Sequence, residues 1–241
     1  MRPMVLIVVI ASVFLALGNA SAGGANVTGT IKFADKQPRL RRLKMTADPA
    51  CAAKHTGPVR SEAVLVNENG TLKNVFVYVK NGLEGMTSAP PSEPVVLDQK
   101  GCVYEPHVIG VQTGQPVKIL NSDGILHNVH PKPKANREFN LAMPKFLKQK
   151  TKTFDKPEVM IPIKCDVHPW MLAYIGVVDH PFYDVTGEAG TFELGTLPAG
   201  TYTVEAWHEI CGTQTQEVTV KEGEAEAVSF AFKPPPRKAK R

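Results

Sequence analysis

The residues best suited to metal chemistry lie in one short stretch, CDVHPWM, which begins at Cys165 and contains His168 and Met171. It offers a thiolate, an imidazole and a thioether within seven residues. A second imidazole, His127, lies upstream in the stretch LHNVH. Two imidazoles, a soft thiolate and a weak thioether make up the ligand set of a blue (type 1) copper site. The pattern therefore points to a copper ion that exchanges one electron.

The same residues exclude several other metal and cofactor sites. A multicopper oxidase has histidines on both sides of its cysteine, whereas Lys164 and Asp166 flank the cysteine here. A dinuclear copper site needs two cysteines in this loop, and Cys165 is alone. The chain lacks the Cys-x-x-Cys-His of covalent haem, and the zincin-like start at His208 has Gly212 where a second histidine is required. Taken singly, each candidate ligand would be an ordinary core or surface residue, so it is their order and spacing that favour copper.

Short strands are expected to position these ligands. The loop that contains the cysteine lies between two predicted strands, residues 159–164 and 173–179, and the upstream histidine follows a third, residues 117–120. Apolar stretches rich in β-branched and aromatic residues recur between turn signals, and long helical periodicity is absent. Residues 26–180 are therefore predicted to form an antiparallel β-sandwich or barrel.

The stretches HNVH and C-x-x-H-P-x-M, in this order, resemble the cupredoxins, the family of blue copper proteins. The short gap between His168 and Met171 is similar to that of amicyanin-like rather than plastocyanin-like members. The resemblance covers residues 100–180 and implies a Greek-key β-sandwich with His127, Cys165, His168 and Met171 as copper ligands. It also implies that Asn128 forms hydrogen bonds near the sulfur and ties the ligand loops together.

A second strand pattern begins near Tyr183. The stretch LPAGTYTVEAW resembles the prealbumin-like sandwich of the carboxypeptidase regulatory-like family. About 50 residues are few for an independent sandwich, so we expect this one to pack on the first, and residues 29–33 could add a strand to it. The expected parts are a signal peptide (1–22), a cupredoxin-like domain with an N-terminal extension (23–181), a regulatory-like sandwich (182–232) and a basic, disordered tail (233–241). The whole chain looks like exported bacterial proteins that join these two domains.

The ends of the chain predict export. Residues 1–22 have the basic start, apolar run and small-residue cleavage site of a signal peptide, and the run is short for an uncleaved membrane anchor. The net charge of +5 arises mainly at the two ends, because the remainder carries 22 basic against 23 acidic residues. We expect a periplasmic or secreted protein with no stable membrane insertion after cleavage and no nucleic-acid partner.

The other cysteines admit two interpretations. In an exported chain two of them are expected to pair, and a disulfide between Cys51 and Cys102 would pin the irregular segment 39–57 to the sandwich, leaving Cys211 over. Alternatively, Cys51 and Cys102 could form a second zinc or copper site with His55 and His107, although the spacing matches no established pattern. Both interpretations stay open at this point.

The ligand set predicts a one-electron carrier and not an enzyme. The alternatives are a copper storage or delivery protein, or a binding or adhesion module in which the second sandwich is the working part. A carrier needs a redox partner such as a c-type cytochrome, and we expect it to dock on Pro169 and Trp170. The ring edge of the adjacent His168 is expected to lie near the surface there, surrounded by the basic residues of segment 132–158.

Overall fold

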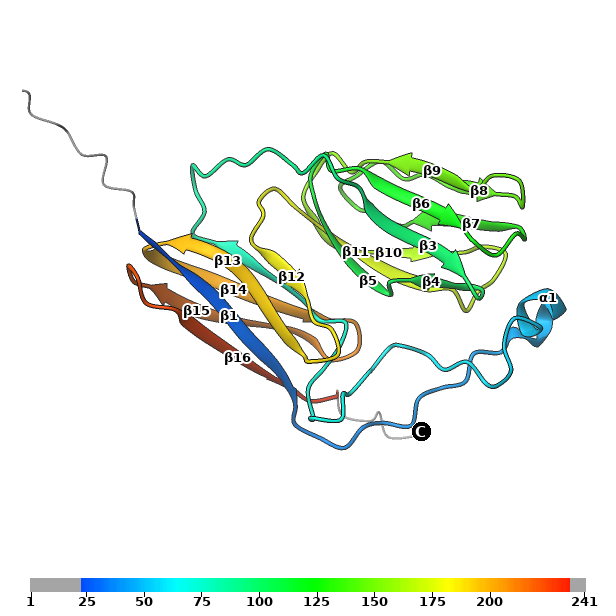
Figure 1. Ribbon diagram of the computed structural model, residues 1–241, viewed down its shortest axis with the longest axis horizontal. Helices are drawn as coiled ribbons and strands as arrows, with labels where there is room; N and C mark the ends of the chain where they lie inside the picture. The colour runs from blue at the N-terminus through cyan, green and yellow to red at the C-terminus, as the bar shows by residue number, and fades with distance from the viewer. Residues whose placement is uncertain (1–22, 235–241) are drawn as a thin grey trace, which may run out of the picture.

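The computed structural model describes residues 23–234, so the predicted signal peptide and most of the predicted tail lie outside the described residues. Within this range the chain is built from sixteen strands, one short α-helix and one 3-10 turn (Figure 1). No helix in this range is long and apolar enough to cross a membrane. The predicted all-β fold class is confirmed.

The larger of two sandwiches carries the candidate ligands. Its sheets have the strand orders β5-β11-β10-β7-β8 and β4-β3-β6-β9. The parallel pairs β5–β11 and β3–β6 require crossovers between sheets, as in a Greek-key sandwich. Alternate residues of these strands face inward, as in β6, and fill one continuous core. The strands are β3 (Val95–Lys100), β4 (Val103–Glu105), β5 (Val108–Gln112), β6 (Val117–Asn121), β7 (His127–Pro131), β8 (Leu141–Met143), β9 (Gln149–Lys152), β10 (Glu158–Lys164) and β11 (Leu172–Val178).

The smaller sandwich has its own core, between sheets of order β13-β1-β16 and β12-β2-β14-β15. In β16 every second residue is buried, which is the period-two pattern of a strand with one face inward. Its strands are β1 (Gly24–Phe33), β2 (Phe76–Asn81), β12 (Tyr183–Val185), β13 (Thr191–Pro198), β14 (Gly200–His208), β15 (Gly212–Val220) and β16 (Glu226–Phe232).

The domain boundary expected at residues 181 and 182 does not describe this arrangement. Strand β1 pairs in parallel with β16, and β2 pairs with both β12 and β14, so two N-terminal strands belong to the C-terminal sandwich. The physical reason is size: the strands that follow residue 182 cannot enclose a core alone, and β1 and β2 supply the missing apolar faces. The possible strand at residues 29–33 thus lies within β1.

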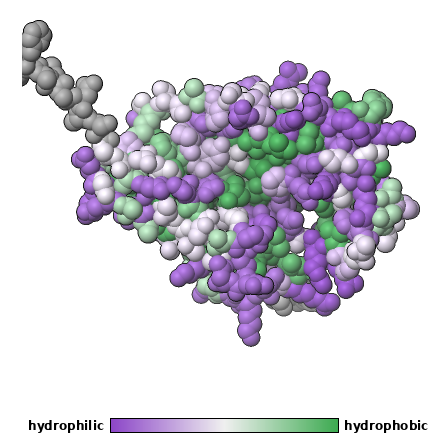
Figure 2. All heavy atoms as spheres, viewed as in Figure 1, coloured by the Kyte–Doolittle hydropathy of each residue, from purple (hydrophilic) through white to green (hydrophobic). Residues whose placement is uncertain are grey.

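The two sandwiches are joined by an aromatic junction. The ring of Phe76 lies over Gly110 and Gly176, where an added Cβ would come within 2.7 Å of ring carbons. Glycine at these two positions therefore lets the ring lie flat against β5 and β11. Figure 2 shows hydrophobic residues gathered in the middle of this face of the molecule, with hydrophilic residues dominating the rim.

Between β1 and β2 the chain leaves the small sandwich and runs along the large one. This excursion contains the 3-10 turn η1 (Met45–Ala47) and the helix α1 (Pro49–Ala52). Figure 1 places α1 at the end of the large sandwich that points away from the small one. Residues 43–60 of the excursion, which we call the cover, pack there through Met45 and Cys51.

Candidate metal centre

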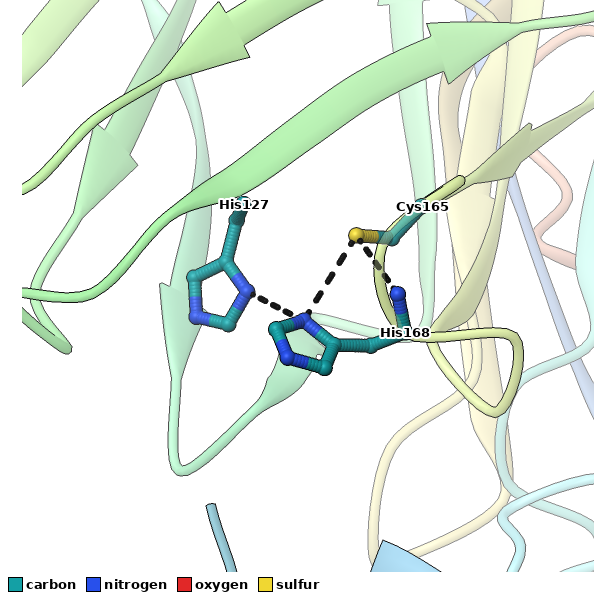
Figure 3. A group of neighbouring side chains, drawn as sticks. All are labelled: His127, Cys165 and His168. Atoms are coloured by element: carbon teal, nitrogen blue, oxygen red, sulfur yellow. Dashed lines mark hydrogen bonds between the residues drawn. The ribbon is translucent and has the colours of Figure 1, made fainter. Parts of the chain in front are cut away.

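Three loop ends bring the candidate ligands together. His127 is the first residue of β7, Cys165 follows the last residue of β10, and His168 lies in the loop before β11. The strands are in register, because Lys164 of β10 pairs with both β7 and β11. All three ligands therefore gather at one end of the five-stranded sheet (Figure 3).

The donor atoms of these three residues converge. Nδ1 of His127 lies 2.9 Å from Nδ1 of His168, which lies 3.8 Å from Sγ of Cys165. One donor atom of each residue lies within 4.8 Å of the others. The side chains are buried, with exposed fractions of 0% for His127, 2% for His168 and 3% for Cys165. The structure thus collects two imidazole nitrogens and one sulfur around a single buried point.

The outer edge of each imidazole is bound to a carboxylate. Nε2 of His127 lies 2.8 Å from Asp123, and Nε2 of His168 lies 2.9 Å from Asp48. A neutral imidazole has one N–H, which is expected on the nitrogen facing a carboxylate, so both Nδ1 atoms are left as acceptors. Two buried lone pairs and a sulfur that face one another need a proton or a metal ion between them. This donor set fits copper, which accepts imidazole and thiolate ligands.

Asp123 is itself held by several donors. Its carboxylate accepts hydrogen bonds from the backbone N–H groups of Gly101 and Cys102, and it forms an ion pair with Lys54. Burial raises the pKa of Asp123, but the hydrogen bond from His127 and these other donors prevail and lower it to about 2. The carboxylate is therefore ionised and fixed before any metal binds.

The environment of the cysteine favours thiolate. Burial opposes ionisation, but the neighbouring imidazole of His127 and hydrogen bonds from backbone N–H groups lower the pKa of Cys165 below its ordinary value. One of these is the N–H of His168, which lies 3.3 Å from the sulfur. A lowered thiol pKa suits a metal ligand, because metals bind the thiolate form.

Asn128 lies beside the sulfur of Cys165. Its Oδ1 lies 3.3 Å from Sγ of Cys165 and accepts the backbone N–H of Asp166 at 2.7 Å. Its backbone carbonyl accepts the hydroxyl of Tyr104 from the facing sheet. Asn128 therefore ties the loop around the cysteine to β7 and to the other half of the sandwich.

Met171 is buried in the same core as Cys165, with an exposed fraction of 1%. Its backbone N–H donates to the carbonyl of His168, which closes a tight turn in the loop. The fourth candidate ligand is thus inside the sandwich at the metal end. Its role as a weak axial ligand remains a prediction.

The structure joins Cys51 and Cys102 by a disulfide, with Cα atoms 5.6 Å apart. Both sulfurs are therefore engaged, and they are not available for the alternative second metal site. The imidazoles proposed for that site have other partners, since His55 contacts the carbonyl of Gly101 and His107 contacts Leu172 and a glutamate. Cys211 is a free thiol of the small sandwich.

The expected surface position of His168 is not found. The cover lies over its outer edge, because Asp48 binds Nε2 and Sγ of Cys51 lies 3.6 Å away. Trp170 is half-buried, packs against the cover and donates its ring N–H to the carbonyl of Cys102. Pro169 is exposed. The structure therefore brings the predicted docking residues to the metal end, but Trp170 is engaged by contacts within the chain.

The residues that sequence reasoning missed are Asp48 and Asp123. Asp123 lies four residues before His127, a spacing that could have suggested a partner for the imidazole. Asp48 precedes Pro49, which signals a helix start, but nothing in the sequence connects it to a histidine 120 residues away.

Fold and site together define a class, an all-β sandwich protein with a buried centre of two histidines and a cysteine. No protein-family model matches the chain, and no curated protein matches it. The similar solved structures are cupredoxins. An oxidised amicyanin variant is 20% identical over 42% of this chain and 97% of its own, with a TM-score of 0.32. The purple cupredoxin from Nitrosopumilus maritimus is 17% identical over 34% and 98%, with a TM-score of 0.29.

The first of these similar structures is a longer chain. It is the Cu-containing nitrite reductase from Thermus scotoductus SA-01, 21% identical over 40% of this chain, with a TM-score of 0.34. Our chain spans 24% of its length. These likenesses are too distant to assign a function. The function is therefore inferred from the donor set itself.

Proposed function

We propose that this protein is a blue copper protein that acts as a one-electron carrier. The observation that supports the proposal is the convergence of two imidazole Nδ1 atoms and one thiolate sulfur, all buried, with both outer nitrogens bound to carboxylates. His127, Cys165 and His168 would hold the copper, with Met171 as a weak fourth ligand. Bound copper would supply one-electron redox chemistry between its two oxidation states.

The chain's own residues would hold the site still. Asp48 and Asp123 fix the imidazole tautomers, and Asn128 fixes the loop that contains the cysteine. Ligands that do not rearrange make the gain and loss of an electron fast. A delivery protein would instead need donors that a second protein can reach, and the burial of these donors argues against that alternative.

The test is the colour of the copper-loaded protein. Oxidised protein with Cu(II) is expected to show an intense sulfur-to-copper charge-transfer band in visible light and to bleach reversibly on reduction. Cys165→Ala should abolish the band, whereas Cys211→Ser, which changes a free thiol of the other sandwich, should leave it intact. A copper-loaded wild type with only a faint band would refute the proposal.

A carrier requires a partner, and we propose an acidic redox protein such as a c-type cytochrome, met in the periplasm. Leu126, Phe146 and Val167 are exposed large hydrophobic side chains on loops at the metal end, and Phe146 is 80% exposed. The loops that carry Leu126 and Phe146 are linked by the side-chain amide of Asn121, which donates to the carbonyls of residues 125 and 143. Exposed lysines at positions 145, 148 and 150 flank this group, which favours an acidic partner.

A further inference from the structure

The outer edge of His168 is closed by a segment that does not belong to the sandwich. Asp48 of the cover binds Nε2 at 2.9 Å, and Sγ of Cys51 lies 3.6 Å from the same nitrogen. The ring of Trp170, which packs against the cover, has its centroid 5.0 Å from that of the imidazole. A ligand expected at the surface is thus enclosed on all these sides and retains 2% exposure.

The carboxylate that binds this histidine is oriented by the backbone of the cover. Asp48 is the N-cap of α1, and its Oδ1 accepts the N–H of Ala50 at 2.8 Å and the N–H of Cys51 at 3.4 Å. Its other oxygen, Oδ2, is the atom that faces His168. One carboxylate therefore connects the start of α1 with the candidate metal ligand.

The cover is fastened to the sandwich at several points. The Cys51–Cys102 disulfide anchors α1, and His55 contacts the carbonyl of Gly101 at 2.7 Å. Lys54 forms an ion pair at 3.2 Å with Asp123, the carboxylate that binds the other imidazole. Both ligand imidazoles are consequently held by carboxylates that are bonded to the cover or lie within it.

We propose that residues 43–60 complete the metal centre as a fixed cover: Asp48 is a positioning residue for His168, and the disulfide keeps the cover closed so that the metal is retained. The inference rests on the proposed copper site and deepens it. Groups that orient a metal ligand through its second nitrogen typically change metal affinity about 10–100-fold when removed. The cover further limits the access of solvent and of competing ligands to the bound ion.

The first experiment measures metal retention. The copper-loaded, reduced protein is mixed with excess bathocuproine disulfonate, and the rate of Cu(I) transfer to this chelator is followed by its colour. The double variant Cys51→Ser/Cys102→Ser is expected to transfer copper about 10-fold faster than wild type. Cys211→Ser serves as the matched control, since it removes a free thiol that packs on the core of the small sandwich, and should transfer copper at the wild-type rate.

The second experiment separates positioning from support of the helix. Asp48→Asn keeps a side-chain oxygen for the N–H groups of α1 but removes the charge that faces His168. We expect faster transfer to the chelator and a changed reduction potential, with only a small loss of thermal stability in the metal-free protein. Asp155→Asn makes the same change at an exposed position and should alter neither the rate of copper transfer, nor the reduction potential, nor the thermal stability. A loss of thermal stability with no change in potential would show that Asp48 only supports α1, and would overturn its assignment.

A third measurement needs no copper. Hydrogen exchange of the metal-free protein is expected to be faster in residues 165–171 when the disulfide is replaced by the two serines. If the double variant and wild type exchange hydrogen and transfer copper at equal rates, and both keep the blue band, the proposed role of the cover is overturned. The proposed function is then left intact. Absence of a blue band in wild type would instead overturn the proposed function, and the exchange result would still decide whether the cover protects the loop.

Discussion

Nδ1 of His127 and Nδ1 of His168 lie 2.9 Å apart although 41 residues separate them in the chain. Each ring reaches this position from a different loop end, and each is oriented by a carboxylate on its other nitrogen. Two buried acceptors at this distance repel one another unless a cation lies between them. This relationship is the reason for expecting that metal binding stabilises the protein.

Copper should therefore raise the melting temperature. A ligand that binds only the folded state stabilises it in proportion to the logarithm of the ligand concentration over its Kd, which is about 2.7 kcal/mol at a hundredfold excess over Kd. Calorimetry with and without copper measures the effect. His127→Ala should remove most of the increase, and an increase of the same size in this variant would place the metal elsewhere.

Met171 is expected to tune the copper more than it holds it. Replacing the thioether by a hydrocarbon removes a weak donor that stabilises the oxidised ion, so Met171→Leu should keep copper and colour and raise the reduction potential. The volume change is small, and the buried site should tolerate it. Voltammetry and the visible spectrum check this, and complete loss of copper would contradict the weak role.

Loss of the disulfide is expected to destabilise the folded state. The Cys51–Cys102 link joins residues 51 positions apart. Closing a loop of that length restricts the unfolded chain, and removal of the link should lower the free energy of unfolding by about 2–4 kcal/mol. Urea denaturation of Cys51→Ser/Cys102→Ser, with Cys211→Ser as control, measures the difference, and non-reduced peptide mapping should find the link in wild type.

Stability should decrease in acid partly through Glu158. Burial raises its pKa, but its carboxylate accepts the backbone N–H groups of Lys134, Ala135 and Asn136, and the net result is a lowered pKa. A carboxyl whose pKa is lower in the folded state contributes stability above its unfolded pKa, near 4.3 for glutamate, and loses it as the pH falls through the folded value. Glu158→Gln should flatten this part of the curve of unfolding free energy against pH below about pH 5.

Partner docking should depend on Phe146. Its exposed ring at the metal end is expected to contact the partner, so Phe146→Ser should slow electron transfer while leaving the blue band unchanged. Stopped-flow reduction by an acidic c-type cytochrome measures the rate, which should also fall as salt screens the nearby lysines. Met86→Ser, an exposed hydrophobic change on another loop, is the control. A rate unaffected by both salt and the Phe146 substitution would place the contact elsewhere.

The sequence alone identified the donor types, their order and the two strands that flank the cysteine loop, but not β7, of which His127 is the first residue. Cys165, His168 and Met171 lie in one short loop, and the alternation of large apolar residues with small or polar ones in β16 is a local pattern that the sequence displays directly. The sequence left open whether Cys51 and Cys102 form a disulfide or a second metal site, because the answer depends on how close two residues 51 positions apart come in space. The tertiary structure brought Cys51 within bonding distance of Cys102.

Only the tertiary structure decided what surrounds the candidate ligands. The contact between Asp48 and His168 spans 120 residues and follows no periodicity, so it arises only when the cover folds back on the sandwich. The same holds for β1 and β2, which complete the small sandwich because its later strands cannot enclose a core alone. Local patterns specify which residues can act, whereas burial, tautomer and access to solvent depend on long-range packing.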